Sequence, residues 1–280
     1  MNWKKKLATY ASLTVLATFI IHIINKLIYF MSTIDNLLGR KEGLYYEWRF
    51  GKIFYTKEGT GKPILLIHDL SACSSEYEWN RIVSDLSKKN TVYTLDLLGC
   101  GKSDKPNFTY TNFLYVQLVT DFINNVIGEK ADVIVTGNSC SFVLMACHNN
   151  DEIIDRILLI NPPSISSISK VPTKRTKMLK FIINIPFIGT LLFNLLHSKD
   201  SIEQTFMTEY FYNPQFVDDE IVKTYCESAQ ISKTQSKYLF ASIKGKYTTA
   251  NITECLTHID NSIFICLLYT SPSPRDRTRS

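Results

Sequence analysis

The chain has 280 residues, of which 45% are hydrophobic and 20% are charged, so it is long and apolar enough for one domain with a large core. Its formal net charge is +5, but Lys4, Lys5 and Lys6 carry three of these charges and the segment 275–279 carries the other two. The body of the chain is therefore neutral, which argues against nucleic-acid binding, because that depends on clustered cations.

The N-terminal segment is long and apolar enough to cross a bilayer. Residues Leu7–Ile24 carry no formal charge, and a spanning helix needs roughly 20 such residues. Lysines precede the run and no small-residue cleavage signal follows it. We therefore predict a retained single-pass membrane anchor over 1–36, with a cleaved or interfacial segment as the alternative. The lysines favour an extracytoplasmic body, although Lys26, Arg40 and Lys41 on the other flank weaken that orientation.

Short strands and helices alternate after the anchor. Alternating hydrophobicity predicts a hairpin of strands over 44–50 and 52–58 that turns at Gly51. Further strands are predicted over 64–68, 91–96, 133–135, 153–160 and 262–265, with helices ending at Leu86, over 110–127 and after the 133–135 strand. Ser75 and Glu78 have capping-box spacing for the first of these helices. Helices that alternate with short apolar strands indicate a mostly parallel sheet covered on both faces.

The stretch from Ala131 to His148 has the layout of a nucleophile elbow. An apolar run ends at Gly137, a serine follows, and a second apolar run is long enough for a buried helix. Such an elbow exposes one serine on a tight strand-to-helix turn. The pattern here is Gly-Asn-Ser-Cys-Ser over 137–141, with serine in place of the second glycine. The alternative is an ordinary turn in which Ser139 caps the helix.

Two further stretches accompany this elbow. The run ILLIHDL over 64–70 ends in His-Asp-Leu, where many hydrolases have His-Gly. The strand over 91–96 leads into a motif formed by Asp96, Gly99, Gly101, Ser103, Asp104 and Pro106. Together the three stretches resemble the α/β-hydrolase superfamily, in the capped branch that includes haloalkane dehalogenases, epoxide hydrolases and serine C–C bond hydrolases. The resemblance covers residues 44–265.

This resemblance implies an α/β-hydrolase fold and a division of the chain. The core would span 43–162, a helical cap would span 163–258 between the sixth and seventh strands, and 259–265 would return as the seventh strand. In the cap, a basic stretch precedes an apolar run over 181–196, which suits either a membrane surface or a helix buried over the site. Residues 266–280 lack any helical or strand period and are expected to be non-native, with a disordered basic tail as the alternative. Strand eight and the last helices would then be missing.

The resemblance also assigns roles to residues. Ser139 would be the nucleophile, and the backbone N–H groups of Leu70 and Cys140 would form the oxyanion hole. Asp69 departs from the family pattern, because a carboxylate beside an oxyanion would repel it unless it points away. Supporting roles in the elbow and the oxyanion motif would fall to His68, Gly137 and Asn138.

The remaining triad members would lie beyond this sequence. In this fold the acid and the histidine follow the nucleophile in chain order, after the seventh and eighth strands. His148, His197 and His258 lie in the elbow helix, in the cap and before the seventh strand. We therefore expect no histidine of this chain to act as the general base, and we expect the chain as given to be inactive.

Two functions fit these observations. The first is a membrane-anchored serine hydrolase acting on esters or related acyl compounds, with lipid-like substrates among the candidates and a serine C–C bond hydrolase as a variant. The second is a non-catalytic α/β-hydrolase-fold protein that binds a ligand or partner under its cap. No cofactor and no nucleic-acid partner are expected. A metal site is not expected either, because the seven cysteines show no paired metal spacing.

Overall fold

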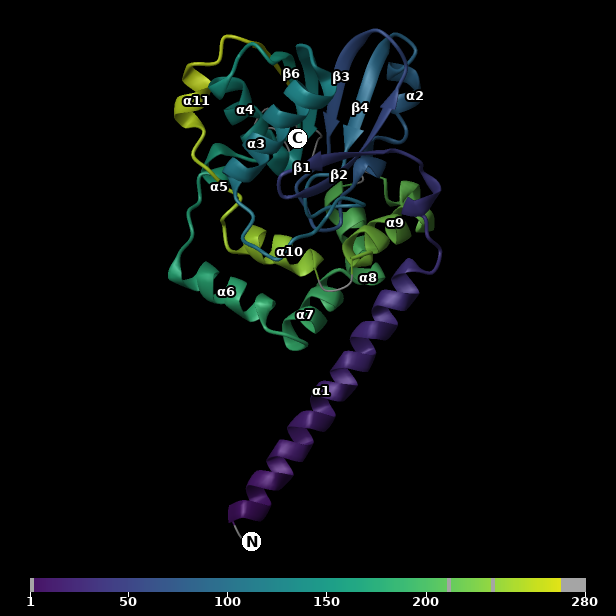
Figure 1. Ribbon diagram of the computed structural model, residues 1–280, viewed down its shortest axis with the longest axis vertical. Helices are drawn as coiled ribbons and strands as arrows, with labels where there is room; N and C mark the ends of the chain where they lie inside the picture. The colour runs from purple at the N-terminus through teal and green to yellow at the C-terminus, as the bar shows by residue number, and fades with distance from the viewer. Residues whose placement is uncertain (1–2, 211–212, 233–234, 268–280) are drawn as a thin grey trace, which may run out of the picture.

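The computed structural model describes residues 3–210, 213–232 and 235–267. A long helix, α1 (Trp3–Thr33), extends from a body in which a central sheet is covered by helices. Figure 1 shows that a group of helices, the cap, lies on the same side of the sheet as α1. Of the segment expected to be non-native, 266–280, residues 268–280 lie outside the described residues.

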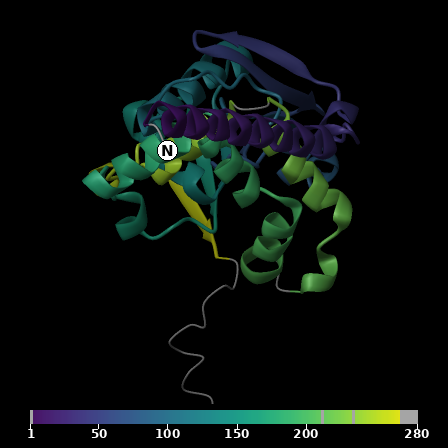
Figure 2. The same ribbon diagram turned by 90° about the horizontal axis from the view of Figure 1, so that it is seen from below.

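The sheet has seven strands in the order β1-β2-β4-β3-β5-β6-β7. Only the β1–β2 and β2–β4 pairs are antiparallel, so the predicted mostly parallel sheet is confirmed. Figure 2 shows the β1–β2 hairpin and β7 on opposite sides of the molecule. The strands are β1 (Leu44–Trp48), β2 (Gly51–Glu58), β3 (Lys62–Ile67), β4 (Asn90–Leu95), β5 (Ala131–Thr136), β6 (Ile154–Ile160) and β7 (Ser262–Cys266).

Apolar packing on both faces explains the central strands. Leu65, Leu66 and Ile67 of β3 are consecutive and fully buried, as expected for a parallel strand covered on both sides. Helix α3 packs beside α4, and Thr111 starts α3 by accepting a hydrogen bond from the Leu114 N–H. The core-side helices and turns are η1 (Leu38–Arg40), η2 (Glu76–Trp79), α2 (Val83–Leu86), α3 (Asn112–Phe122), η3 (Ile123–Ile127), η4 (Gly137–Ser139) and α4 (Cys140–Asn149).

The predicted capping box does not form, although Ser75 does precede the first turn. Ser75 forms no side-chain cap bond, and a 3₁₀ turn and the four-residue α2 replace the single expected helix. The capping box fails because the Glu78 carboxylate is used elsewhere: it accepts hydrogen bonds from the Asp69 N–H and the Thr136 hydroxyl. A long-range polar contact therefore overrides the local spacing.

Between β6 and β7 the described residues are helical wherever they are regular. A loop after β3 packs beneath this cap, where Ala72 joins Phe193, Phe240 and Ala241 in one apolar cluster. The cap elements are α5 (Ile165–Ile168), α6 (Lys174–Asn184), α7 (Ile188–Leu196), α8 (Lys199–Thr205), η5 (Phe206–Tyr210), η6 (Pro214–Phe216), α9 (Asp219–Gln230), α10 (Ser236–Lys244) and α11 (Thr253–Thr257).

Helix α1 and the turn that follows it are joined to the cap by polar contacts. The Asn25 side chain donates a hydrogen bond to the Phe187 carbonyl. The Glu227 carboxylate accepts from the backbone N–H groups of Leu37 and Leu38. Within the described ranges α1 is the one unbroken helix long and apolar enough to cross a membrane, and its most apolar window is unburied. A signal sequence near an N-terminus would pass the same test.

Candidate functional site

The candidate site lies at the carboxyl ends of β3 and β5, where ligands of α/β sheets bind. The loop after β3 and the turn after β5 form its floor, and cap helices form its roof. Between them is a cavity of about 550 Å³. Residues that line it include Asp69, Glu78 and Asn138 on the floor and Phe206, Tyr225 and Phe240 on the roof.

The sharp turn after β5 falls at Gly137. Among residues 136–141 it alone has a positive φ, +55°. In a nucleophile elbow the residue at the strained turn carries the nucleophile, and the N–H of the next residue is one oxyanion donor. Here the strained position has no side chain, and the next N–H belongs to Asn138.

Ser139 lies in the first turn after this position and points into the protein. Its side chain is 0% exposed, and its hydroxyl donates a 2.6 Å hydrogen bond to the His68 carbonyl. The Cys140 N–H, expected in the oxyanion hole, donates instead to the Gly137 carbonyl within the turn. The structure thus brings Ser139 and Cys140 to the turn, but the Ser139 hydroxyl and the Cys140 N–H both donate to backbone carbonyls.

The Asp69 carboxylate points at the turn. It accepts hydrogen bonds from the Asn138 backbone N–H at 2.6 Å and from the Asn138 side chain at 3.1 Å. Burial raises the pKa of Asp69, and hydrogen bonds from Asn138 and the Leu70 N–H oppose that rise. The carboxylate therefore accepts hydrogen bonds from the Asn138 and Leu70 N–H groups. These are the two donors that this geometry would offer to an oxyanion.

The orientation of the Asp69 side chain requires a residue without a side chain at position 137. A Cβ atom added to Gly137 would lie 2.3 Å from an Asp69 carboxylate oxygen, far inside van der Waals contact. A serine at the strained position and an aspartate in this orientation therefore exclude each other. In this conformation the Asp69 carboxylate does not point away from the Asn138 N–H, so it would repel an oxyanion placed there.

Glu78 joins the loop that carries Asp69 to the end of β5 by hydrogen bonds. One of its carboxylate oxygens accepts a 3.2 Å hydrogen bond from the Asp69 N–H, and the other accepts from the Thr136 hydroxyl. Burial, with the nearby Asp69 charge, raises the pKa of Glu78 to about 7. The floor of the cavity therefore holds two neighbouring carboxyl groups. Sequence reasoning missed this pair, because only its capping-box spacing was visible.

His68 has a structural role. It is 0% exposed, and its Nε2 accepts a 3.1 Å hydrogen bond from the Leu97 N–H. The ring is then neutral, with Nδ1–H donating to the Asp69 carbonyl at 2.7 Å. Burial lowers the pKa of His68 to about 4, so the ring ties the β3 loop to the β4 loop and stays uncharged.

The other histidines lie apart from Ser139. His197 lines the cavity roof, is 8% exposed, and contacts the Phe193 carbonyl through Nδ1. Burial lowers the pKa of His197 to about 4. Its place in the cavity was missed in the sequence, because it stands in a cap stretch without a motif. His148 and His258 pack against each other near α4 and α11.

The motif after β4 builds a turn. The Asp96 carboxylate accepts hydrogen bonds from the Glu76 and Lys102 backbone N–H groups at 2.6 and 2.7 Å. A Cβ on Gly101 would lie 2.2 Å from Asp96, which explains glycine there. The buried Lys105 donates to the Ser228 carbonyl, so the motif also fastens α9 of the cap to the core. Within the described residues no cluster of His, Cys, Asp and Glu suits a metal ion.

Comparisons with known proteins agree with this architecture. Over 86 residues the chain is 34% identical to 2-hydroxy-6-oxo-6-(2'-aminophenyl)hexa-2,4-dienoic acid hydrolase of Metapseudomonas resinovorans, covering 30% of this chain and 29% of that protein. Over 110 residues it is 25% identical to a soluble epoxide hydrolase of Corynebacterium sp., covering 39% and 38%. The chain thus spans less than two-fifths of the length of these curated relatives.

Solved structures show the same fold over more of the chain. A meta-cleavage product hydrolase from Pseudomonas fluorescens aligns with a TM-score of 0.61 at 18% identity, over 80% of this chain and 79% of that one. A membrane phospholipase A described as a bacterial virulence factor aligns with a TM-score of 0.61 at 15% identity, over 94% and 82%. The family model described as "Alpha/beta hydrolase family" matches residues 64–264. The chain therefore belongs to the alpha/beta hydrolase family.

Proposed function

We propose that this chain is a membrane-anchored protein of the α/β-hydrolase fold that binds a small, largely apolar molecule beneath its cap through an amine or hydroxyl group. The observation that carries the proposal is the 2.6 Å hydrogen bond from the Asn138 N–H to the Asp69 carboxylate. An oxyanion hole presents donors to its ligand. Here a carboxylate covers those donors, and the floor presents acceptors instead.

The apolar walls and the volume of the cavity indicate what the body of the ligand would be. Phe206, Ile202 and Phe240 of the cap are almost fully buried and line it. Its volume, about 550 Å³, lies within the ~300–1,000 Å³ usual for small-molecule sites. An aliphatic or aromatic body with one donor group at the Asp69–Glu78 end satisfies both the apolar walls and the acidic floor.

Photolabelling tests this occupancy. Full chain in membranes would be irradiated with a diazirine analogue of dodecylamine, and adducts would be mapped by peptide mass spectrometry. Thr205→Trp places a large ring in the cavity, because Thr205 lines it. Gln204→Trp adds the same ring on the exposed side of α8. We expect adducts on α8, which lines this cavity and not the one beside α1, that disappear in the first variant and persist in the second. Equal labelling of both variants would reject the site.

Anchoring by α1 is part of the same proposal. The helix is 31 residues long, and its most apolar window has a mean hydropathy of 1.9 and no buried residue. A surface of this kind is stable in lipid and unfavourable in water. The full, uncleaved chain should stay with membranes through a carbonate wash at high pH. Its release into the wash would show that α1 does not anchor it.

A serine hydrolase is the second candidate, with esters or related acyl compounds as substrates. It is favoured by the position of Ser139, between the carboxyl end of β5 and the start of α4, where this family carries its nucleophile. Its hydroxyl would have to leave the His68 carbonyl, and Asp69 would have to leave the Asn138 N–H. Turnover of p-nitrophenyl esters by the full chain that is lost in Ser139→Ala would establish this candidate in place of the first.

A further inference from the structure

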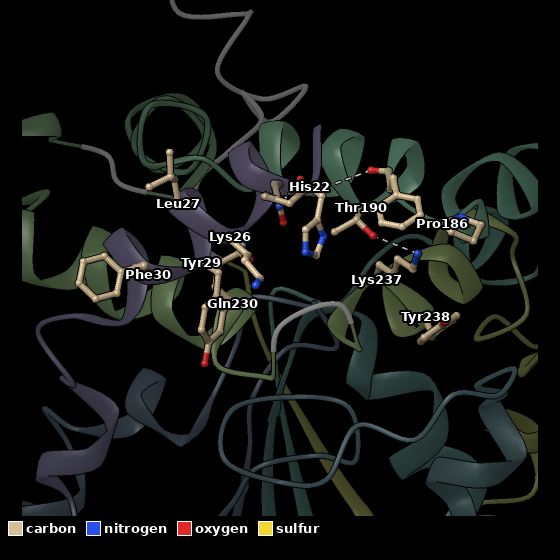
Figure 3. A pocket seen from close by; sticks show the side chains of 13 residues that line it. His22, Lys26, Leu27, Tyr29, Phe30, Pro186, Thr190, Gln230, Lys237 and Tyr238 are labelled. Carbon is tan, nitrogen blue, oxygen red and sulfur yellow. Dashed lines mark hydrogen bonds between the residues drawn. The ribbon is translucent and has the colours of Figure 1, made fainter. Parts of the chain in front are cut away.

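A second cavity lies between α1 and the cap, away from the floor formed by Asp69 and Glu78. It measures about 690 Å³ and is lined by the C-terminal half of α1 together with residues of α7, α9 and α10. Figure 3 shows Leu27 and Phe30 of α1, with Pro186, Thr190 and Lys237 of the cap, around this space.

A buried cation faces this cavity. Lys237 is 3% exposed, and its ammonium group donates to the Thr190 hydroxyl at 3.1 Å and to the Ile185 carbonyl at 3.4 Å. Within the described ranges it forms no salt bridge. Burial lowers the pKa of Lys237, because a charged ammonium is costly to bury without an anion. An anionic group in the cavity would supply the missing counter-charge.

Unused amide groups accompany the lysine. Gln230 is 1% exposed and lines the cavity, and its side-chain nitrogen has no hydrogen-bond partner among the described residues. The Asn194 side-chain oxygen is likewise unpartnered there, although its nitrogen donates to Asn25. This oxygen is an acceptor, so it matches a hydroxyl donor of the ligand and not the anionic group itself. Buried polar atoms in native proteins are nearly always bonded. These groups therefore mark a polar end that a ligand would complete.

The opposite side of the cavity is apolar and belongs to the anchor. Leu27 and Phe30 of α1 are 54% and 60% exposed, and Phe187 of the cap is 41% exposed. Lys26 and His22 stand on the same stretch of α1 and also line the cavity. An acidic headgroup with an attached acyl chain matches both ends.

We propose that this cavity binds an anionic membrane lipid, with the Lys237 ammonium and the Gln230 amide holding its acidic headgroup and Leu27, Phe30 and Phe187 contacting its acyl chain. The lipid would join α1 to the cap at the membrane surface. The inference rests on the proposed anchoring by α1. Its test is made in detergent, so failure of lipid binding is distinguishable from failure of anchoring.

Native mass spectrometry of the full chain in a non-ionic detergent measures the binding. Phosphatidylglycerol and phosphatidylcholine would be titrated in parallel, with oleic acid and inorganic phosphate as further arms. We expect the wild type to prefer phosphatidylglycerol or oleic acid over phosphatidylcholine. Lys237→Met should weaken that binding by roughly tenfold or more, the effect of one lost charge-assisted hydrogen bond. Lys177→Met, which removes an exposed charge of α6, should change it less than about twofold.

A second variant covers the case in which Lys237→Met does not fold. Leu27→Trp fills the cavity from the exposed face of α1, and Leu13→Trp places the same ring on α1 outside it. Binding lost only in Leu27→Trp supports the site, and the arm that loses it identifies a phospholipid or a free fatty acid. Equal binding of all lipids in wild type and variants would overturn the proposal, as would competition by inorganic phosphate at the affinity of phosphatidylglycerol.

Discussion

At the scale of single residues, the position of one hydroxyl separates the two functions. Ser139 is fully buried and donates to the His68 carbonyl, so the structure gives it the role of a backbone tie. A nucleophile would face the cavity and would be dispensable for folding. The two roles predict opposite effects on stability when the hydroxyl is removed.

We therefore expect Ser139→Ala to destabilise the chain by about 1–2 kcal/mol, because the buried His68 carbonyl loses its donor. Ser84→Ala, on the exposed surface of α2, should stay within about 0.5 kcal/mol of wild type. Thermal unfolding of both variants followed by tryptophan fluorescence provides the comparison. A Ser139→Ala variant as stable as Ser84→Ala would mean that the hydroxyl does not hold the loop.

Glu78 gives the site a pH dependence. Its pKa rises from an ordinary 4.5 to about 7 in the folded chain, so the folded chain holds this proton more tightly than the unfolded one. The stability that Glu78 contributes is therefore complete below pH 4.5 and is lost as the pH rises through about 7. The loss is about 3 kcal/mol, because each pKa unit corresponds to about 1.4 kcal/mol.

The substitution Glu78→Gln imitates the protonated acid and should make this decline smaller. The part due to Asp96, whose pKa burial also raises to about 7, should remain. Glu129→Gln changes an exposed carboxyl beyond η3 and should leave the decline intact. Unfolding midpoints from pH 4.5 to 8 would reveal the difference. Parallel curves for wild type and Glu78→Gln would rule out Glu78 as the titrating group.

At the scale of elements, the turn between β5 and α4 and the loop after β3 act as one unit. Gly137 has a φ of +55°, and a Cβ there would meet Asp69 at 2.3 Å. Gly137→Ala should therefore destabilise the chain by roughly 1–3 kcal/mol, through left-handed backbone strain and through the clash. Only the clash depends on Asp69.

A double-mutant cycle isolates that part. In an Asp69→Gly background the cost of Gly137→Ala should fall by roughly 0.5–3 kcal/mol, the range for residues in contact. Gly128→Ala is a suitable control, since Gly128 also has a positive φ but a Cβ there would meet nothing. Strictly additive effects at positions 69 and 137 would show that the two residues do not touch.

The strands and turns differ in how far the sequence alone predicts them. Leu65, Leu66 and Ile67 form a continuous apolar run, and this local pattern alone predicts a buried strand. The sequence predicts a turn after β5, but it does not predict which residue of the turn has the strained backbone. Whether Gly137 or Ser139 takes the strained position depends on the Asp69 carboxylate, 68 residues earlier in the chain. Likewise Glu78 leaves its capping-box role for contacts with Asp69 and Thr136, which no local spacing records.

At the scale of the whole molecule, the cap lies between α1 and the sheet (Figure 1). The fold and the family were predictable, because three motifs stand in the family order along the chain. The two cavities were not, since each is assembled from segments far apart in the sequence: the β3 loop with α8–α10, and α1 with α7 and α10. The cavity under the cap has carboxyl groups on its floor, and the cavity at the anchor has a lysine and amides in its lining. The two proposed ligands therefore have opposite charges.

Headgroup selectivity in the cavity beneath the cap tests the central claim most directly. The full chain in membranes at pH 8 would be photolabelled with diazirine analogues of dodecylamine and of dodecanoate. Adducts on α8, which lines this cavity and not the one beside α1, would be normalised to adducts on the α1 residues before His22. We predict that the amine labels the cavity at least about tenfold more than the carboxylate, as expected for a charge-assisted contact with the floor, and that Asp69→Asn reduces this preference. Labelling by the carboxylate at or above the level of the amine would contradict an acceptor floor.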